Sequence, residues 1–272
     1  MSINRDHIDN ESQSSLFNMR GIDLVERGWL DEAINQFKHA IKNAPHMAQS
    51  YDNIASAYAD KGELFLALTS YVKAIELEPE NPIALHNLGC FLSNFGNRLA
   101  ARCFKNAFNL DPELYEARFN YGLCFAAEDK HEQAIAQFQS ALSIEDDHEA
   151  RFHLALSYIA LEKFAAAIKE LNHVVNVDQD HDQAWFHLGS SYQEQGFLEE
   201  AEHALSKSVI KNPHNVEALL TLASLLKRLE RTKESRSLLK RAFSLDQKRT
   251  HEFVATDDYL CHEANLLNKK QK

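Results

Sequence analysis

Residues 185–213 read WFHLGSSYQEQGFLEEAEHALSKSVIKNP, a stretch that has a glycine near its middle and closes on a proline. Ala201 and Leu205 come after Gly196 and are four residues apart, which places both side chains on one face of an α-helix. Pro213 ends that helix, because proline lacks the N–H that would continue the hydrogen-bond ladder. The stretch therefore predicts two helices joined by a short turn at Gly196.

The same pattern recurs along the chain every 33 or 34 residues. The small residue of the second helix recurs at Ala33, Ala67, Ala100, Ala134, Ala167, Ala201 and Ser235. A large apolar residue follows four positions later at Phe37, Tyr71, Phe104, Phe138, Leu171, Leu205 and Leu239. Such a period is typical of helical repeat arrays, in which neighbouring helix pairs stack because no pair can bury its own apolar face. We therefore expect an all-α fold of seven antiparallel helix-turn-helix repeats over residues 14–247.

These columns resemble those of the tetratricopeptide repeat family, with the bacterial scaffold or adaptor members as the expected type. The sixth repeat carries the family pattern nearly complete, and the seventh is the most degenerate, with Glu230 in place of the turn glycine and Ser235 in place of the alanine. The resemblance implies a right-handed superhelical solenoid in which the first helix of each repeat lines a concave groove.

Both ends of the chain lie outside the repeats. We expect residues 1–13 to be a disordered tail or a frayed helix start. Residues 248–272 are expected to hold a C-terminal capping helix and a tail, with the helix over residues 256–269, because an array needs a cap at its exposed end. The alternative is that this terminal segment moves and occupies the groove.

Composition excludes several classes of function. The chain has 29 basic and 40 acidic residues and a formal net charge of -11, which argues against nucleic acid, whose binding needs clustered cations. The sequence contains no run of about 20 apolar residues, so no insertion into a membrane is expected. Four cysteines without a CxxC spacing favour reduced thiols and a cytoplasmic location.

No constellation predicts an enzyme. The sequence has no assignable nucleophile and base, and no glycine-rich phosphate loop, because the repeat uses the glycines. His148 and His181 lie in acidic turns between repeats, where we expect solvated charges rather than a metal site. No metal and no cofactor is therefore expected.

One position of the first helices carries amides in three successive repeats. It reads Asn53, Asn87 and Asn120, and continues as His153 and His187. An amide both donates and accepts, so a ladder of amides one repeat apart can bind the main chain of an extended peptide. The pattern resembles the asparagine ladder of the O-linked N-acetylglucosamine transferase solenoid. The alternative is that asparagine is merely tolerated at an exposed position.

The preceding position becomes aromatic in the later repeats, at Phe119, Phe152 and Phe186. If it faces the groove, these rings form an exposed apolar stripe of the kind that marks binding surfaces. The alternative is that the rings pack between first helices. The acidic rim of the groove is expected at Glu116, Glu149 and Glu217. The lysines of the family's clamp for acidic chaperone tails are absent from the column that holds Phe119.

These features favour a non-catalytic protein-protein interaction scaffold or adaptor. It would bind a protein or peptide partner through an extended segment with hydrophobic and some basic residues. Two alternatives are open: a self-assembling oligomeric platform, which resembles the magnetosome-associated scaffold of the family, and a regulatory subunit of an enzyme held in trans.

Overall fold

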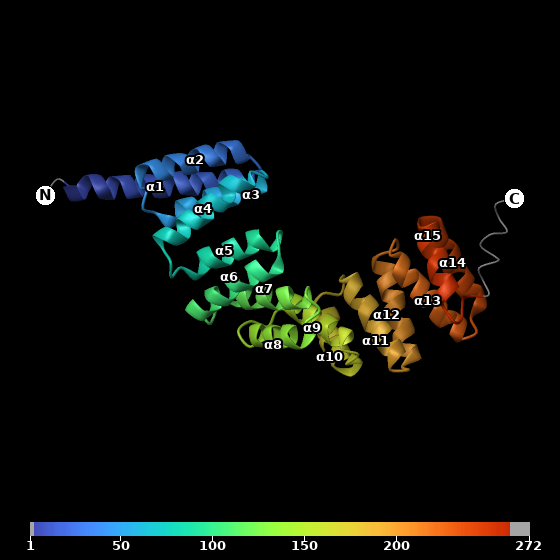
Figure 1. Ribbon diagram of the computed structural model, residues 1–272. Coiled ribbons are helices and arrows are strands. Elements are labelled where there is room, and N and C mark those ends of the chain that lie inside the picture. Colours follow the sequence, from blue (N-terminus) through green and yellow to red (C-terminus); the bar gives the residue numbers. More distant parts are fainter. Residues whose placement is uncertain (1–2, 262–272) are drawn as a thin grey trace. The chain divides into compact units, whose positions relative to one another are not determined.

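The computed structural model describes residues 3–261 of the chain, and the regular structure in this part is entirely helical. Contacts between residues divide the chain into an N-terminal unit, residues 1–144, and a C-terminal unit, residues 145–272. Figure 1 shows that each unit is a stack of antiparallel helix pairs. The expected all-α repeat fold is therefore confirmed.

The helices alternate between the first and second members of the seven expected pairs. The N-terminal unit contains α1 (Ile3–Glu26), α2 (Leu30–Asn43), α3 (Ala48–Asp60), α4 (Leu64–Leu77), α5 (Pro82–Ser93), α6 (Asn97–Leu110), α7 (Tyr115–Ala126) and α8 (His131–Leu142). The C-terminal unit contains α9 (His148–Ala160), α10 (Phe164–Val177), α11 (Asp182–Glu194), α12 (Leu198–Lys211), α13 (Val216–Arg228), α14 (Thr232–Leu245) and α15 (Gln247–Thr256).

Each pair closes through a small residue of its first helix and a large residue of its second. A Cβ atom built on Gly122 of α7 would lie 2.6 Å from Cε1 of Phe138 on α8, closer than two carbons can approach. The ring thus occupies the space that a side chain at Gly122 would need. The small and large columns of the second helices are buried in all seven pairs, as the periodicity predicts. Ser235, which replaces the small residue in the last pair, donates its hydroxyl to the Ala223 carbonyl at 2.7 Å.

In six of the seven pairs the turn places one residue in the left-handed region, and the third pair differs, with φ of 154° at Gly96. Gly28, Gly62 and Gly196 provide it, with φ between 79° and 82°. The fourth, fifth and seventh pairs lack this glycine, and the left-handed residues there are Asp129, Glu162 and Glu230, with φ of 57°, 56° and 62°. The turn is therefore fixed by the repeat geometry even where the residue is not glycine.

The two ends differ in detail from the expected boundaries. Residues 3–13, expected to be a disordered tail or a frayed helix start, form the first turns of α1. At the other end, α15 ends at Thr256, and residues 257–261, which belong to the capping helix predicted over residues 256–269, contain no α-helix. Residues 262–269 lie outside the described part of the chain.

Helix α15 packs against α14 and α13. Val254 and Leu260 are fully buried in one apolar cluster with the last repeat. Asp246 begins the helix by accepting a hydrogen bond from the Arg249 backbone N–H at 2.9 Å. The segment directly after the seventh pair thus covers its apolar face, which a terminal repeat needs.

The packing of the small column can be tested at α8. Ala134→Leu should lower the free energy of unfolding by about 1–3 kcal/mol, because Ala134 is fully buried and the added carbons overpack the contact. Urea titration followed by circular dichroism measures the change. Ala136→Leu, on the same helix but exposed, is the control and should leave the free energy of unfolding nearly unchanged. Equal stabilities of the two variants would contradict the packing.

Candidate functional site

The candidate site in the N-terminal unit lies on the first helices α3, α5 and α7. Each contributes the two adjacent columns that the sequence singled out: Asp52 and Asn53, His86 and Asn87, and Phe119 and Asn120. All six side chains are partly buried. Because α3, α5 and α7 belong to successive repeats, polar atoms of these columns can contact one another from one repeat to the next.

The polar side chains form one continuous network across the three helices, which we call the polar network. The Asn87 side chain on α5 donates from Nδ2 to Oδ2 of Asp52 on α3 at 2.6 Å. Nδ2 of Asn120 on α7 lies 2.9 Å from Nε2 of His86 on α5. Nδ1 of His86 in turn lies 3.4 Å from Oδ1 of Asn87. Asn87 and Asn120 thus each bridge to the preceding repeat.

The geometry assigns one direction of hydrogen bonding. Nδ2 of Asn120 can only donate, so Nε2 of His86 accepts and the ring carries its proton on Nδ1. The Nδ1 proton then points to Asn87, which donates to Asp52. Burial lowers the pKa of His86, which keeps the ring neutral as this arrangement requires. The network therefore runs from donors at α7 to an acceptor, the Asp52 carboxyl group, at α3.

The acceptor end has unused hydrogen-bonding capacity. Burial raises the pKa of Asp52 to about 6, against the opposing effect of the hydrogen bond from Asn87. Oδ1 of Asp52 and Nδ2 of Asn53 are buried and have no hydrogen-bond partner within the described residues. Oδ1 of Asn18 on α1 is in the same state, although its Nδ2 donates to Ser50 at 2.8 Å. A buried polar atom without a partner costs about 1–3 kcal/mol, which a bound hydrogen-bonding group would recover.

In the C-terminal unit the corresponding columns are aromatic and histidine. The interpretation of Phe152 as part of an exposed stripe is wrong, because its side chain is only 4% exposed. Its ring packs against His181, with 4.5 Å between ring centroids, and lies 5.9 Å from His187. Burial lowers the pKa of His187 to about 4, so this ring is neutral near pH 7. His153 lies 3.4 Å from the carboxylate of Glu149.

Phe119 and Phe186 are half-buried and likewise pack within the fold. The Phe119 ring stacks on Tyr115 with 5.9 Å between centroids, and lies at the same distance from Phe138. Phe186 packs against the apolar cluster that includes Leu220. Glu116, Glu149 and Glu217 are exposed, as the acidic rim requires. The aromatic column is thus mainly packing in both units, since each ring fills space beside its own helix pair.

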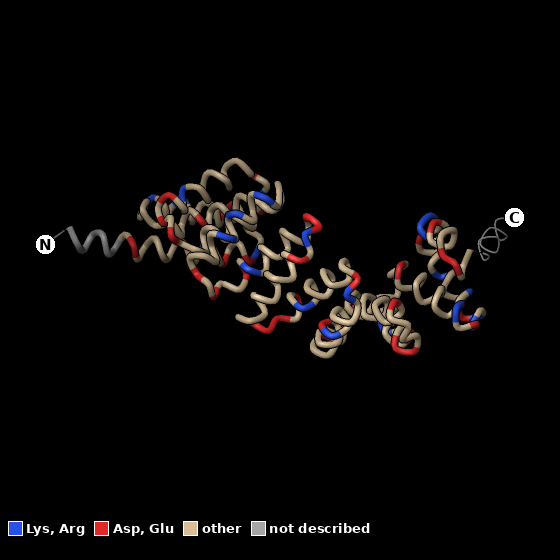
Figure 2. The backbone as a smooth tube through the Cα atoms, turned by 60° about the horizontal axis from the view of Figure 1, so that its bottom comes forward, with Lys and Arg blue, Asp and Glu red and all other residues tan. Residues whose placement is uncertain are grey.

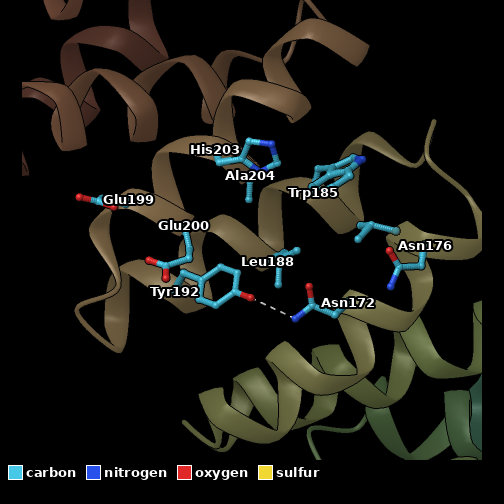
Figure 3. A pocket seen from close by; sticks show the side chains of 10 residues that line it. Asn172, Asn176, Trp185, Leu188, Tyr192, Glu199, Glu200, His203 and Ala204 are labelled. Atoms are coloured by element: carbon cyan, nitrogen blue, oxygen red, sulfur yellow. Dashed lines mark hydrogen bonds between the residues drawn. The ribbon is translucent and has the colours of Figure 1, made fainter.

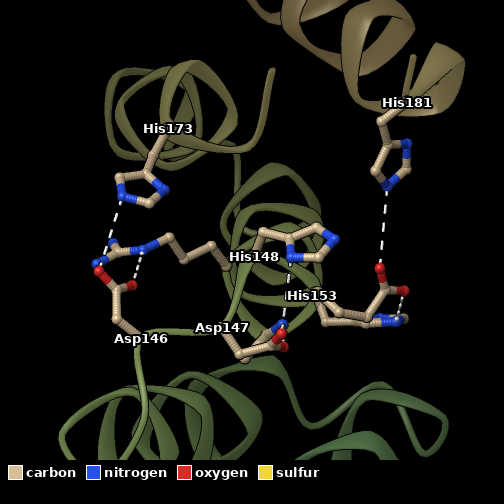
Figure 4. Close-up of polar contacts among 9 residues, drawn as sticks. Asp146, Asp147, His148, His153, His173 and His181 are labelled. Atoms are coloured by element: carbon tan, nitrogen blue, oxygen red, sulfur yellow. Dashed lines mark hydrogen bonds and ion pairs between the residues drawn. The ribbon is translucent and has the colours of Figure 1, made fainter. Parts of the chain in front are cut away.

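Histidines and carboxylates near the turn before α9 make local polar contacts, and Asp146 is shared between two of them (Figure 4). Arg151 donates to Asp146 at 2.7 Å and to the nearly buried Glu170 at 2.6 Å. His173 lies 3.8 Å from Asp146, and His148 lies 3.7 Å from Asp147. Within residues 3–261, no three His, Cys, Asp or Glu side chains converge as metal ligands would.

A groove that the sequence did not predict lies between α10, α11 and α12 (Figure 3). It encloses about 390 Å³ and is lined by Trp185 and Tyr192, with Glu199, Glu200 and His203 at its edge. The Tyr192 hydroxyl accepts a hydrogen bond from Nδ2 of Asn172 at 3.1 Å. Trp185 and Tyr192 belong to the sixth repeat, and its periodic pattern does not indicate a groove beside them.

The raised pKa of Asp52 makes a prediction about stability. A carboxyl group whose pKa is about 6 when folded and 3.8 when unfolded contributes stability below pH 3.8 and loses it as the pH rises through 6. Asp52→Asn should therefore raise the free energy of unfolding at pH 7 by about 1–2 kcal/mol, less than the full pKa change implies, because water still reaches the group.

Urea titrations of wild type and Asp52→Asn over a pH series measure this difference, which should shrink to zero as the pH falls from 6 to below 4. Asp60→Asn, at an exposed position of the same helix, is the control. A destabilised Asp52→Asn variant at pH 7 would mean that the carboxylate is stabilised by the fold rather than penalised.

Family models match most of the chain. A TPR repeat model matches residues 55–91. One tetratricopeptide repeat model matches residues 125–189, and a second matches both residues 94–150 and residues 186–248. The described residues contain no helix that is both long and apolar enough to cross a membrane.

Two curated relatives and one solved structure illustrate the similarity. The chain is 32% identical over 76 residues to the chloroplastic tetratricopeptide repeat domain-containing protein PYG7 of Arabidopsis thaliana. The matched segment covers 28% of this chain and 25% of that relative. It is 28% identical over 92 residues to the photosystem I assembly protein Ycf3 of Prochlorococcus marinus. This matched segment covers 33% of this chain and 53% of that relative.

The solved structure is that of pilF of Pseudomonas aeruginosa, with a TM-score of 0.70 at 18% identity, over 77% of this chain and 96% of that one. The chain spans about a quarter to about half the length of the curated relatives that it matches. Helix pairs, buried columns and family models agree over most of the chain, which therefore belongs to the tetratricopeptide repeat proteins, a family of protein-interaction scaffolds.

Proposed function

We propose that the chain is a non-catalytic adaptor that holds an extended segment of a partner protein against the first helices α3, α5 and α7. The observation that carries the proposal is the polar network, which links three repeats and leaves Oδ1 of Asp52 and Nδ2 of Asn53 without partners. A peptide main chain offers both an N–H donor and a carbonyl acceptor at every residue, and so can satisfy both atoms. The assembly role of the relative Ycf3 is in keeping with such an adaptor.

The network changes how the asparagines would act in the N-terminal unit. Nδ2 of Asn87 and of Asn120 are used inside the chain, so these residues would meet a peptide through their oxygens, whereas Asn53 would meet it through its nitrogen. In the C-terminal unit, His153 and His187 would take the equivalent position on α9 and α11. There Phe152 and Phe186 would support the surface from below, as Phe119 would on α7.

The charges indicate the chemistry of the partner segment. Glu116 and Glu149 are exposed beside the two columns, and the whole chain has a net charge of -11, which suits a segment with some basic residues. The proposal includes a reducing, cytoplasmic setting, since all four cysteines are unpaired. A regulatory subunit of an enzyme held in trans would use the same surface in the same way.

The test uses peptides selected on the full chain from a random displayed library, followed by calorimetric titration of the tightest peptide. The variant is Asn53→Ala with Asn120→Ala, which leaves the donor of Asn87 to Asp52 in place. Two hydrogen bonds to the main chain contribute about 1 kcal/mol each, so affinity should fall about thirtyfold. Circular dichroism should show an unchanged fold.

The matched control replaces Asn106 and Asn109, two exposed asparagines of α6, by alanine and should bind as wild type does. An unaltered affinity of the Asn53 and Asn120 variant would reject the proposal. An equal loss in the control would reject it too, because the effect would not belong to the polar network.

Self-assembly is the second candidate function, and the surface of α4 favours it. Phe65, Leu68 and Val72 lie along one side of α4 and are 76%, 38% and 43% exposed. No charged residue lies between Glu63 and Lys73. An apolar surface of this kind pairs well with a second copy of itself, since a twofold axis brings identical patches together.

Sedimentation of wild type against Phe65→Ser with Leu68→Ser tests this candidate. A wild-type dimer that the double variant converts to monomer is the expected result. A wild type that stays monomeric at all concentrations would exclude self-assembly while leaving the adaptor proposal intact.

A further inference from the structure

One stretch of this acidic protein has no acidic residue at all. Between residues 81 and 110 there is no Asp or Glu, while Arg98, Arg102 and Lys105 all lie on α6. Spacings of four and three place these three cations on one face of the helix. Figure 2 shows the charges along the backbone, with red and blue residues mixed over most of the chain. The face is thus a local exception to the net charge of -11.

This face borders a groove between α6 and α7, which we call the basic groove. The groove encloses about 260 Å³, and Lys130, which follows α7 in the chain, also lines it. Tyr121 and Phe125 form its apolar wall, with 4.6 Å between their ring centroids. Glu128, the carboxylate at its edge, is held by Lys130 at 2.5 Å. The basic groove therefore combines exposed cations with room for one large apolar side chain.

The three cations of α6 are not used by the fold. Within the described residues, none of them has a hydrogen bond or an ion pair, and all three are exposed. By contrast, Lys61 lies within 2.7 Å of two carboxylates and Arg231 binds two as well. Lys61 and Arg231 are thus paired within the fold, whereas Arg98, Arg102 and Lys105 of the basic groove are available to a ligand.

We propose that the basic groove is a second docking site, which takes an acidic segment of a partner protein with an apolar side chain seated on Tyr121 and Phe125. Arg98 and Arg102 are about 6 Å apart along the helix at 1.5 Å per residue. Alternate residues of an extended segment are about 7 Å apart and point to the same side, so carboxylates at alternate positions match the two guanidinium groups.

A long polyanion fits the groove less well than a short acidic segment does. Only a few cations gather here, and a nucleic acid that extended beyond them would meet a surface of net negative charge. The apolar wall also needs an aliphatic or aromatic side chain, which a phosphate or a nucleic-acid backbone lacks. The basic groove shares no residue with the polar network, so this inference goes beyond the proposed function and stands or falls separately.

The test measures fluorescence anisotropy of a labelled peptide that alternates glutamate and serine around a central leucine, titrated with the full chain at low ionic strength. Arg98→Glu with Arg102→Glu should weaken binding by more than about tenfold, because two attractive pairs become repulsive. A lysine version of the peptide should bind this variant better than wild type. The control, Lys163→Glu with Lys169→Glu, replaces an exposed cation directly before α10 and one within it, changes the net charge equally, and should bind as wild type does.

Several results would overturn the proposal. Equal losses in the α6 variant and the control would mean that only net charge matters. An undiminished affinity after replacement of the central leucine by glycine would exclude the apolar seat. Displacement by inorganic phosphate, or tighter binding of a single-stranded oligonucleotide, would assign the groove to another ligand. A wild-type dimer that the α6 variant abolishes would assign it to a second copy of the chain.

Discussion

The contact between a small residue on the first helix and a large residue on the second is the constraint on which the rest of the structure depends. At Gly122 and Phe138 a single added carbon would overlap the ring, and the same holds for Gly89 with Phe104. This close approach fixes the distance between the two helices of a pair. It thereby fixes which side chains of successive first helices come within hydrogen-bond reach, as Asn87 and Asp52 do across 35 positions of sequence.

The sequence predicted the fold well because packing follows periodicity. Ala134, Phe138 and Ala141 recur at spacings that only one helical face satisfies, and all three are fully buried. Boundaries were harder to predict, since the polar segment from Gln247 to Thr256 has no strong apolar period, and its helix depends on the Asp246 cap and the burial of Val254.

The candidate site was predicted by position but not by contact. Periodicity placed Asn53, Asn87 and Asn120 on one face, yet it could not show that the amides of two of them bind the preceding repeat. Asp52 and His86 were visible in the adjacent column, but that column was interpreted through its later phenylalanines. Phe152 illustrates the reason: whether a ring faces solvent or the next helix pair depends on rotamers and on His181, which belongs to another repeat.

The polar network also has an orientation. Its hydrogen bonds all point from Asn120 on α7 towards Asp52 on α3, so the dipoles of the linked groups add, with their positive ends directed towards the Asp52 carboxyl group on α3. A polypeptide is itself directional, because reversing the chain exchanges the order of its N–H and C=O groups. If an extended segment binds along these helices as proposed, its two directions are therefore unequal in energy, and such a surface would select the polarity of the bound chain as well as its composition.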